Sequence, residues 1–137
     1  MAPSHLEAES RDMAAHFGAN ISVTLGDELL AAGCGAIHAV GRAADDAPRL
    51  IDLTWGDENA PKITIVGKGV TFDSGGLDMK PGSAMRMMKK DMGGAANAIG
   101  LAYLIMAEQL PVRLRLLVPT AENAISGNAF RPGDILH

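Results

Sequence analysis

The sequence has little of the material that builds disulfide frameworks or membrane anchors. It contains one cysteine, Cys34, so no disulfide can form within the chain, which is typical of proteins from reducing compartments. Aromatic residues make up 4% of the chain, and no apolar run reaches about 18 residues, the length that spans a bilayer. The N-terminal stretch MAPSHLEAESRDMAAHF is too charged for a secretory signal. We therefore expect a soluble, cytoplasmic protein with no membrane partner.

Runs of basic residues are also missing. The net charge is −4, and the first 60 residues carry ten acidic and only three basic side chains. The nine bases of the remaining chain are dispersed among six acids and form no long patch. Nucleic-acid binding normally needs a basic stripe or face, so we expect no nucleic-acid partner.

What the chain does have is enough apolar residues for one domain: 137 residues, 47% of them hydrophobic. The hydrophobic patterns and turn residues predict helices at 4–17, 27–33 and 91–111, and strands at 21–26, 48–56, 62–67 and 112–123. Alternation of strands and helices predicts an α/β fold with a mixed, largely parallel sheet flanked by helices. Residues 126–137 read as turns.

Several local features carry their own predictions. Ser4 can cap the first helix, and Glu7 stands at the capping-box position. Residues 36–40 predict a small-residue strand or turn, and 57–62 a hairpin-like turn between two strands. Cys34 lies among small apolar residues, which favours a buried structural thiol over a nucleophile.

A glycine-rich stretch, VGKGVTFDSGG at residues 66–76, carries the chemistry. It does not match a phosphate-binding loop, because Lys68 is followed by Gly69 and not by Ser or Thr. It does not match a dinucleotide fingerprint either, because Phe72 stands where the third glycine belongs. Both kinds of nucleotide site are therefore disfavoured.

A metal site is a second interpretation of the same region. Asp73 and Asp91 each adjoin a pair of glycines, in DSGG and DMGG, which would let the backbone crowd around a small cation. Two carboxylates could hold Mg, Mn or Zn, and a neutral lysine amine such as that of Lys68 could add a ligand. On composition alone, a glycine-rich turn with solvated charges is the favoured interpretation.

The exact order of residues in this region favours the metal site over a turn with solvated charges. VGKGVTFDSGGLDMKPGSAMRMMKKDMGGAA closely resembles the signature region of the leucyl aminopeptidase family, the cytosolic di-metal peptidases. AVGRAADDAPRLIDLTW resembles an upstream turn and strand of the family, and LRLLVPTAENAISGNAFRPGDIL resembles its next strand and ENxxSGxAxRPGD loop. About 100 of the 137 residues are covered in the same order. The resemblance implies the family's catalytic-domain fold.

When the family's functional residues are matched by position to this sequence, the resemblance implies roles for five residues. Lys68 matches an unusual lysine metal ligand, Asp73 the carboxylate that bridges both metals, and Asp91 a further ligand of the lysine-bound metal. Lys80 matches the catalytic lysine, which stabilises the oxyanion and is not a ligand. Met88 matches a residue of the pocket for the substrate's first side chain, although a core role fits it nearly as well.

The implied activity is release of N-terminal amino acids, of leucine type, from peptides by metal-activated water. The implied cofactors are two divalent ions, Mn or Zn, with a bicarbonate held by an arginine, and the implied assembly is a homo-oligomer, a hexamer in the family. The family's downstream Asp-x-Glu-Gly-Arg motif, which carries that arginine, does not occur before His137. We therefore expect residues 1–137 to be a partial catalytic domain without its C-terminal half. We expect it to have little or no activity alone. The alternative is a non-catalytic metal-binding or assembly module that retains the fold.

Overall fold

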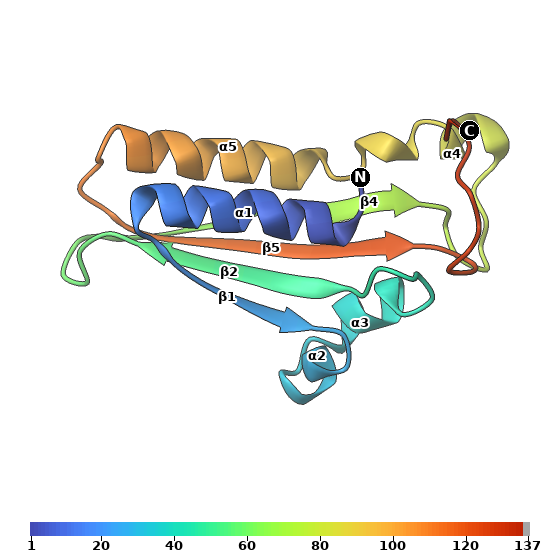
Figure 1. Cartoon of the computed structure of the whole chain (residues 1–137), viewed down its shortest axis with the longest axis horizontal. Coiled ribbons are helices and arrows are strands. Elements are labelled where there is room, and N and C mark those ends of the chain that lie inside the picture. Colours follow the sequence, from blue (N-terminus) through green and yellow to red (C-terminus); the bar gives the residue numbers. More distant parts are fainter. Residues whose placement is uncertain (136–137) are drawn as a thin grey trace.

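A five-stranded mixed sheet with helices packed against it forms the centre of the molecule (Figure 1). The structure is a computed structural model that describes residues 1–135. Its elements in chain order are α1 (Pro3–Phe17), β1 (Asn20–Leu25), α2 (Glu28–Ala31), α3 (Gly35–Gly41), β2 (Arg49–Trp55), β3 (Lys62–Val66), β4 (Gly69–Asp73), α4 (Gly82–Met85), the 3₁₀ turn η1 (Met88–Lys90), α5 (Gly93–Ala107) and β5 (Arg113–Asn123). The predicted turns of 126–137 include Leu136 and His137, which lie outside the described residues.

The long strand β5 organises the sheet, whose order is β1-β2-β5-β3 with β4 also paired to β5. Along one edge β5 pairs antiparallel with β2, from Trp55 opposite Leu114 to Arg49 opposite Thr120. Along its other edge it pairs in parallel first with β3 and then with β4. The strands β3 and β4 therefore act as two halves of one interrupted strand beside β5.

The α/β prediction is confirmed, but the prediction of a largely parallel sheet is wrong. The β1–β2 and β2–β5 pairings are antiparallel and longer than the two parallel pairings of β5. The reason lies in the connections. The segment between β1 and β2 holds only the short helices α2 and α3, which pack at the end of these strands, so the chain turns back beside β1. Only α5, between β4 and β5, makes a full crossover that yields parallel strands.

The main hydrophobic core lies under α1 and α5, which run side by side over one face of the sheet (Figure 1). Alternate residues of β5, Leu114, Leu116 and Val118, point into this core and are fully buried. Ile51 and Leu53 of β2 do the same, as period-two alternation requires. Packing against this core holds α1 and α5 on the sheet. The chain segments before and after each helix are positioned with it.

Helix α5 is apolar on more than its buried side. Ala102 and Met106 are buried, whereas Tyr103 is 46% exposed. Leu101 and Leu104 are also exposed. Among residues 1–135, no helix combines the length and the apolar character needed to cross a membrane.

A break between β3 and β4 brings α5 close to the sheet edge. The Gly67 N–H still donates to the Leu117 carbonyl at 3.0 Å, but the next carbonyl, of Lys68, accepts the Ala95 N–H of α5 at 2.8 Å. A Cβ on Gly67 would lie 2.6 Å from the Ala98 Cβ and 2.7 Å from the Gly94 carbonyl oxygen. Glycine is therefore required for this close approach.

The N-terminus of α1 differs from its predicted cap. Ala2 is the N-cap, and the Ser4 N–H donates to Asp46 Oδ2 at 3.0 Å instead of Ser4 capping the helix. Glu7 accepts a hydrogen bond from the buried Arg49 guanidinium at 2.5 Å. Arg49 also bonds Asp46, so two tertiary contacts anchor this helix end. Locally, the Ala2 N–H donates to His5 Nδ1 at 3.0 Å, so His5 and not Glu7 supplies the side chain that bonds back to the N-cap.

Three further local predictions need correction. Residues 35–41 form helix α3, neither strand nor turn. The 57–62 segment turns, but it does not close a hairpin, because β5 lies between β2 and β3. Cys34 is half-buried at the start of α3 and not part of the core, with its Sγ 3.7 Å from the Ala32 carbonyl. The errors at residues 35–41 and at Cys34 arise in a small-residue segment whose conformation is set by what packs against it, whereas the error at 57–62 arises from the strand order.

We predict that Gly67→Ala destabilises the chain by about 1–3 kcal/mol, because the added methyl group would overlap α5. Gly100→Ala is the matched control, because nothing lies within 4 Å of a Cβ there, and it should stabilise α5 by about 0.5–1 kcal/mol. Thermal and urea unfolding of the two variants measures both effects. Equal effects of the two substitutions would contradict the close approach.

The Glu7–Arg49 contact predicts a pH-dependent contribution to stability. Burial opposes ionisation of Glu7, but hydrogen bonds from Arg49 and Arg11 outweigh it and lower the pKa of Glu7. Glu7→Gln should cost about 1 kcal/mol at pH 7, and this difference should shrink as pH falls through the lowered pKa of Glu7. Unfolding at several pH values measures it, with Glu9→Gln on the exposed side of α1 as control. A difference that stays constant down to low pH would refute the interpretation.

Candidate functional site

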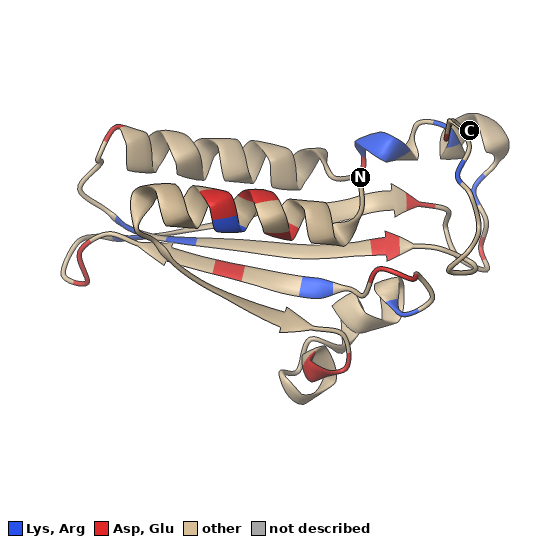
Figure 2. Cartoon of the chain, in the orientation of Figure 1, with Lys and Arg blue, Asp and Glu red and all other residues tan. Residues whose placement is uncertain are grey.

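The candidate site lies where β4 and β5 end. These strands are parallel, so their carboxyl ends meet at one edge, and polar residues placed there gather in one region. Asp73 closes β4, and Glu122 and Asn123 close β5. Figure 2 shows acidic residues at both strand ends and basic residues in the turns beside them. Residues of opposite charge thus meet at this end of the sheet.

Asp73 is held by neighbours on both carboxylate oxygens. Its Oδ1 accepts the Gly75 N–H at 2.9 Å and the side-chain amide of Asn123 at 2.8 Å. Its Oδ2 lies 3.1 Å from the Lys80 ammonium. Burial alone would raise the pKa of Asp73, but the Gly75, Lys80 and Asn123 contacts together hold it below its usual range. Asp73 is therefore an ionised, oriented carboxylate at neutral pH.

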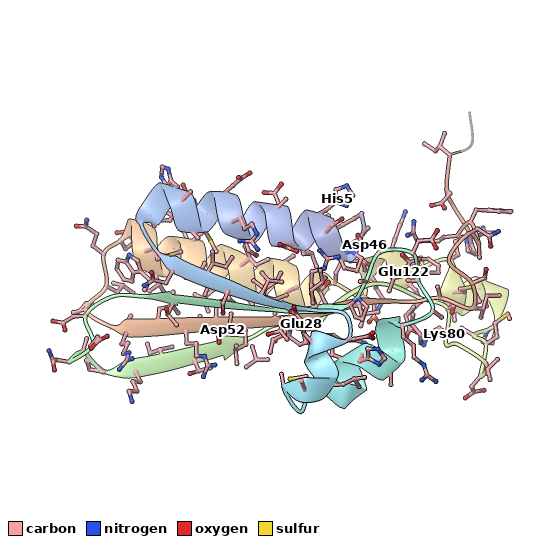
Figure 3. The ribbon with its side chains drawn as sticks, turned by 60° about the horizontal axis from the view of Figure 1, so that its bottom comes forward. His5, Glu28, Asp46, Asp52, Lys80 and Glu122 are labelled. Carbon is pink, nitrogen blue, oxygen red and sulfur yellow. The ribbon has the colours of Figure 1, made fainter. Side chains whose placement is uncertain are left out.

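The turn after Asp73 brings Lys80 back toward it. Gly75 has φ +91°, and a Cβ there would lie 2.3 Å from the Asp78 carbonyl oxygen, so only glycine fits. The Lys80 N–H donates to the Ser74 carbonyl at 2.9 Å and closes the turn. Figure 3 shows Lys80 and Glu122 at the same end of the sheet. Gly75 of the sequence motif therefore serves this turn.

Lys68 and Asp91 form the second pair. Lys68 lies at the break between β3 and β4, and Asp91 follows η1 just before α5. The Lys68 Nζ donates to Asp91 Oδ1 at 3.0 Å and lies 2.8 Å from Oδ2. Oδ2 is buried and has this ion-pair contact but no further hydrogen bond within the described residues. A buried carboxylate oxygen with spare acceptor capacity beside an amine is a donor set that suits a divalent cation.

The structure brings the four predicted polar residues together as two pairs, Lys68 with Asp91 and Lys80 with Asp73. In the described part of the chain, no three His, Cys, Asp or Glu side chains cluster closely enough to hold a metal between them. The carboxylates available to a cation are therefore those of the two lysine-paired aspartates.

Met88 stands apart from the nearest apolar cavity. It is half-buried in η1, which packs against β4. A cavity of about 70 Å³ lies beyond the ends of β4 and β5, and its lining includes Phe72, Met79, Met85 and Phe130 but not Met88. The role of Met88 in a substrate pocket stays a prediction.

Three residues of the site were given no role from the sequence: Asn123, Glu122 and Arg131. Arg131 makes two hydrogen bonds to Glu122, at 2.7 and 2.5 Å, and its guanidinium carbon lies 6.0 Å from the centre of the Phe72 ring. Hydrogen bonds to Glu122 raise the pKa of Arg131, while burial opposes the shift. The sequence signal for Glu122 and Asn123 is their position, because polar residues that end a buried strand lie next to those that end its parallel neighbour. Arg131, in the loop after β5, has no such signal.

Comparison with known proteins agrees with this arrangement. The profile of the cytosol aminopeptidase family, catalytic domain, matches residues 1–137. The chain is 43% identical over 136 residues to a probable cytosol aminopeptidase of Geobacter sp. (strain M21), covering 98% of this chain and 28% of that protein. It thus spans about 28% of the length of the curated relatives it matches.

Solved structures agree as well. The chain resembles the crystal structure of the cytosol aminopeptidase from Coxiella burnetii with a TM-score of 0.88 and 55% identity, covering 98% of this chain and 29% of that one. It resembles the bottromycin maturation enzyme BotP in complex with Mn with a TM-score of 0.82 and 39% identity, covering 97% of this chain and 29% of that one. Sequence and fold therefore show that the chain belongs to the cytosol aminopeptidase family and corresponds to part of its catalytic domain.

Proposed function

We propose that this chain supplies part of the active site of a metal-dependent aminopeptidase that removes N-terminal residues, of leucine type, from peptides in the cytoplasm. The observation that carries the proposal is the pair of lysine–aspartate contacts at the carboxyl ends of two parallel strands. Family membership supports the reaction type, and the name of the curated relatives supports a cytosolic location.

Divalent metal ions fit the residues present. Lys68, once neutral, would offer an amine, Asp91 its buried Oδ2, and Asp73 the Oδ2 that now faces Lys80. We propose two ions, Mn or Zn, in the complete site, and the structure of the relative BotP contains Mn. Metal ions in such a site activate water and polarise the scissile carbonyl.

Lys80 is the proposed catalytic residue. Its side chain is 31% exposed, so it can reach a substrate, and its backbone is fixed by the closed turn. Its ammonium would stabilise negative charge that develops on the carbonyl oxygen when water adds. Asp73 stays ionised and restrains this ammonium until substrate is present. Met88 is proposed to contact the first side chain of the substrate.

Residues 1–137 are proposed to be the N-terminal part of a larger catalytic domain that assembles as a homo-oligomer. The coverage of about 28% of the curated relatives supports a larger domain. The exposed apolar side chains of α5, Leu101 and Leu104, agree with burial against further protein.

A second candidate is a metal-binding or assembly module without turnover. The absence of a cluster of three His, Cys, Asp or Glu side chains within residues 1–135 favours it for this chain. Manganese binding without release of leucine from a chromogenic leucyl amide would support it. Turnover that disappears in Asp73→Ala would exclude it.

We predict that Mn²⁺ binds the purified chain and that Asp91→Asn weakens binding by more than about tenfold. Binding should release a proton, because the Lys68 ammonium must lose one to become a ligand. Calorimetry in buffers of different ionisation enthalpy measures both quantities. Lys68→Met should abolish the proton release.

Asp78→Asn is the matched control, since Asp78 is exposed in the neighbouring turn and makes no ion pair in the described residues. If it weakens Mn²⁺ binding as much as Asp91→Asn, the ion is held by general negative charge and the proposed ligands are wrong.

The catalytic role is tested in a chimera in which this chain replaces the matching segment of the Coxiella burnetii enzyme, to which it is 55% identical. We expect the chimera to hydrolyse a leucyl amide, and Lys80→Met to lower its kcat by about 10²- to 10³-fold. Lys62→Met, on the exposed strand β3, should leave kcat unchanged. A folded chimera that retains full kcat with Lys80→Met would remove Lys80 from the mechanism.

A further inference from the structure

We propose that Asn123 is the positioning residue for Asp73, and that it fixes this carboxylate so that Oδ2 faces the site. The expected effect on metal binding rests on the proposed function. The contact between Asn123 and Asp73 is independent of any metal. Asn123 is the last residue of β5, directly beside the end of β4. The two lysine–aspartate pairs described above do not by themselves give Asn123 a role.

The contact with Asp73 is specific to one oxygen. The Asn123 amide donates to Oδ1 at 2.8 Å, and the Gly75 N–H donates to the same atom at 2.9 Å. Two donors from different strand ends fill Oδ1, so the carboxylate cannot turn without losing both. The other oxygen, Oδ2, is left to the Lys80 ammonium at 3.1 Å. The carboxylate is thus oriented before any substrate or ion arrives.

Asn123 is itself held in place by its main chain. Its carbonyl oxygen accepts the Ser74 N–H at 3.0 Å and the Ser74 hydroxyl at 2.6 Å. The side chain has room because residue 76 is glycine: a Cβ at Gly76 would lie 3.3 Å from Asn123 Oδ1, and this glycine has φ +70°. The end of β5 and the turn after Asp73 are therefore locked to each other around the Asn123 side chain.

Glu122, the residue before Asn123, is held by the loop that follows β5. Glu122 is 6% exposed and receives two hydrogen bonds from Arg131. Arg131 is in turn placed by Asp134, whose Oδ2 accepts the Arg131 N–H at 2.8 Å. The loop after β5 thus folds back on the strand end and restrains the backbone that carries Asn123. A donor held this firmly suits the orientation of a ligand better than its direct coordination.

The experiment measures the orientation of Asp73 first and metal affinity second. Three-bond couplings between the Hα and Hβ protons of Asp73 should report one χ1 rotamer in the wild-type chain and averaged values in Asn123→Ala. Asn123→Leu, which removes the donor and keeps the volume, should do the same. Mn²⁺ affinity measured by calorimetry should fall about tenfold in both variants.

The control is Asn97→Ala on α5, which removes an exposed amide that donates to the Gly93 carbonyl at 2.8 Å. It should change neither quantity. Unchanged Asp73 couplings in both Asn123 variants would overturn the proposal, and so would equal changes in Asn97→Ala. If the wild-type chain binds no Mn²⁺, the proposed metal centre of this chain fails, while the couplings still decide the role of Asn123.

Discussion

The close approach of α5 to the interrupted edge of the sheet is the contact on which the site depends. At the break between β3 and β4, the Lys68 carbonyl accepts the Ala95 N–H of α5 and does not pair with β5. Gly67 makes room there for the helix. At this position the Lys68 ammonium lies within hydrogen-bond distance of Asp91, which stands just ahead of α5. A continuous strand in place of β3 and β4 would keep Lys68 in the sheet.

The second half of the site depends on β5 as a common template. Because β4 runs parallel to β5, Asp73 and Asn123 end side by side, and the turn that follows Asp73 carries Lys80 back to the same carboxylate. Each lysine faces one aspartate, so the charges are balanced within the protein. These contacts orient both carboxylates, and the Gly75, Lys80 and Asn123 contacts lower the pKa of Asp73 against the opposing effect of burial.

Some elements were predictable because their signal is local. The hydrophobic pattern of residues 4–17 predicts the helix found as α1, and that of 112–123 predicts the strand found as β5. Segments of small residues were not predictable in this way. Helix α3 was expected to be strand or turn, because alanine and glycine fit several conformations and only packing against β5 selects the helix. A mixed sheet is predicted correctly, but its largely antiparallel pairing is not, because pairing direction depends on where a connection packs.

The sequence by itself singled out four polar residues, Lys68, Asp73, Lys80 and Asp91, by residue type, flanking glycines and family resemblance, and their catalytic and metal-binding roles are proposals. It also determined that one domain with an α/β core would form. Only the tertiary structure decided which lysine faces which aspartate, and that Asn123 and the Arg131–Glu122 pair hold the end of β5. The reason is physical: Asn123 is 50 residues from Asp73 along the chain, and only the parallel pairing of β4 with β5 brings them together.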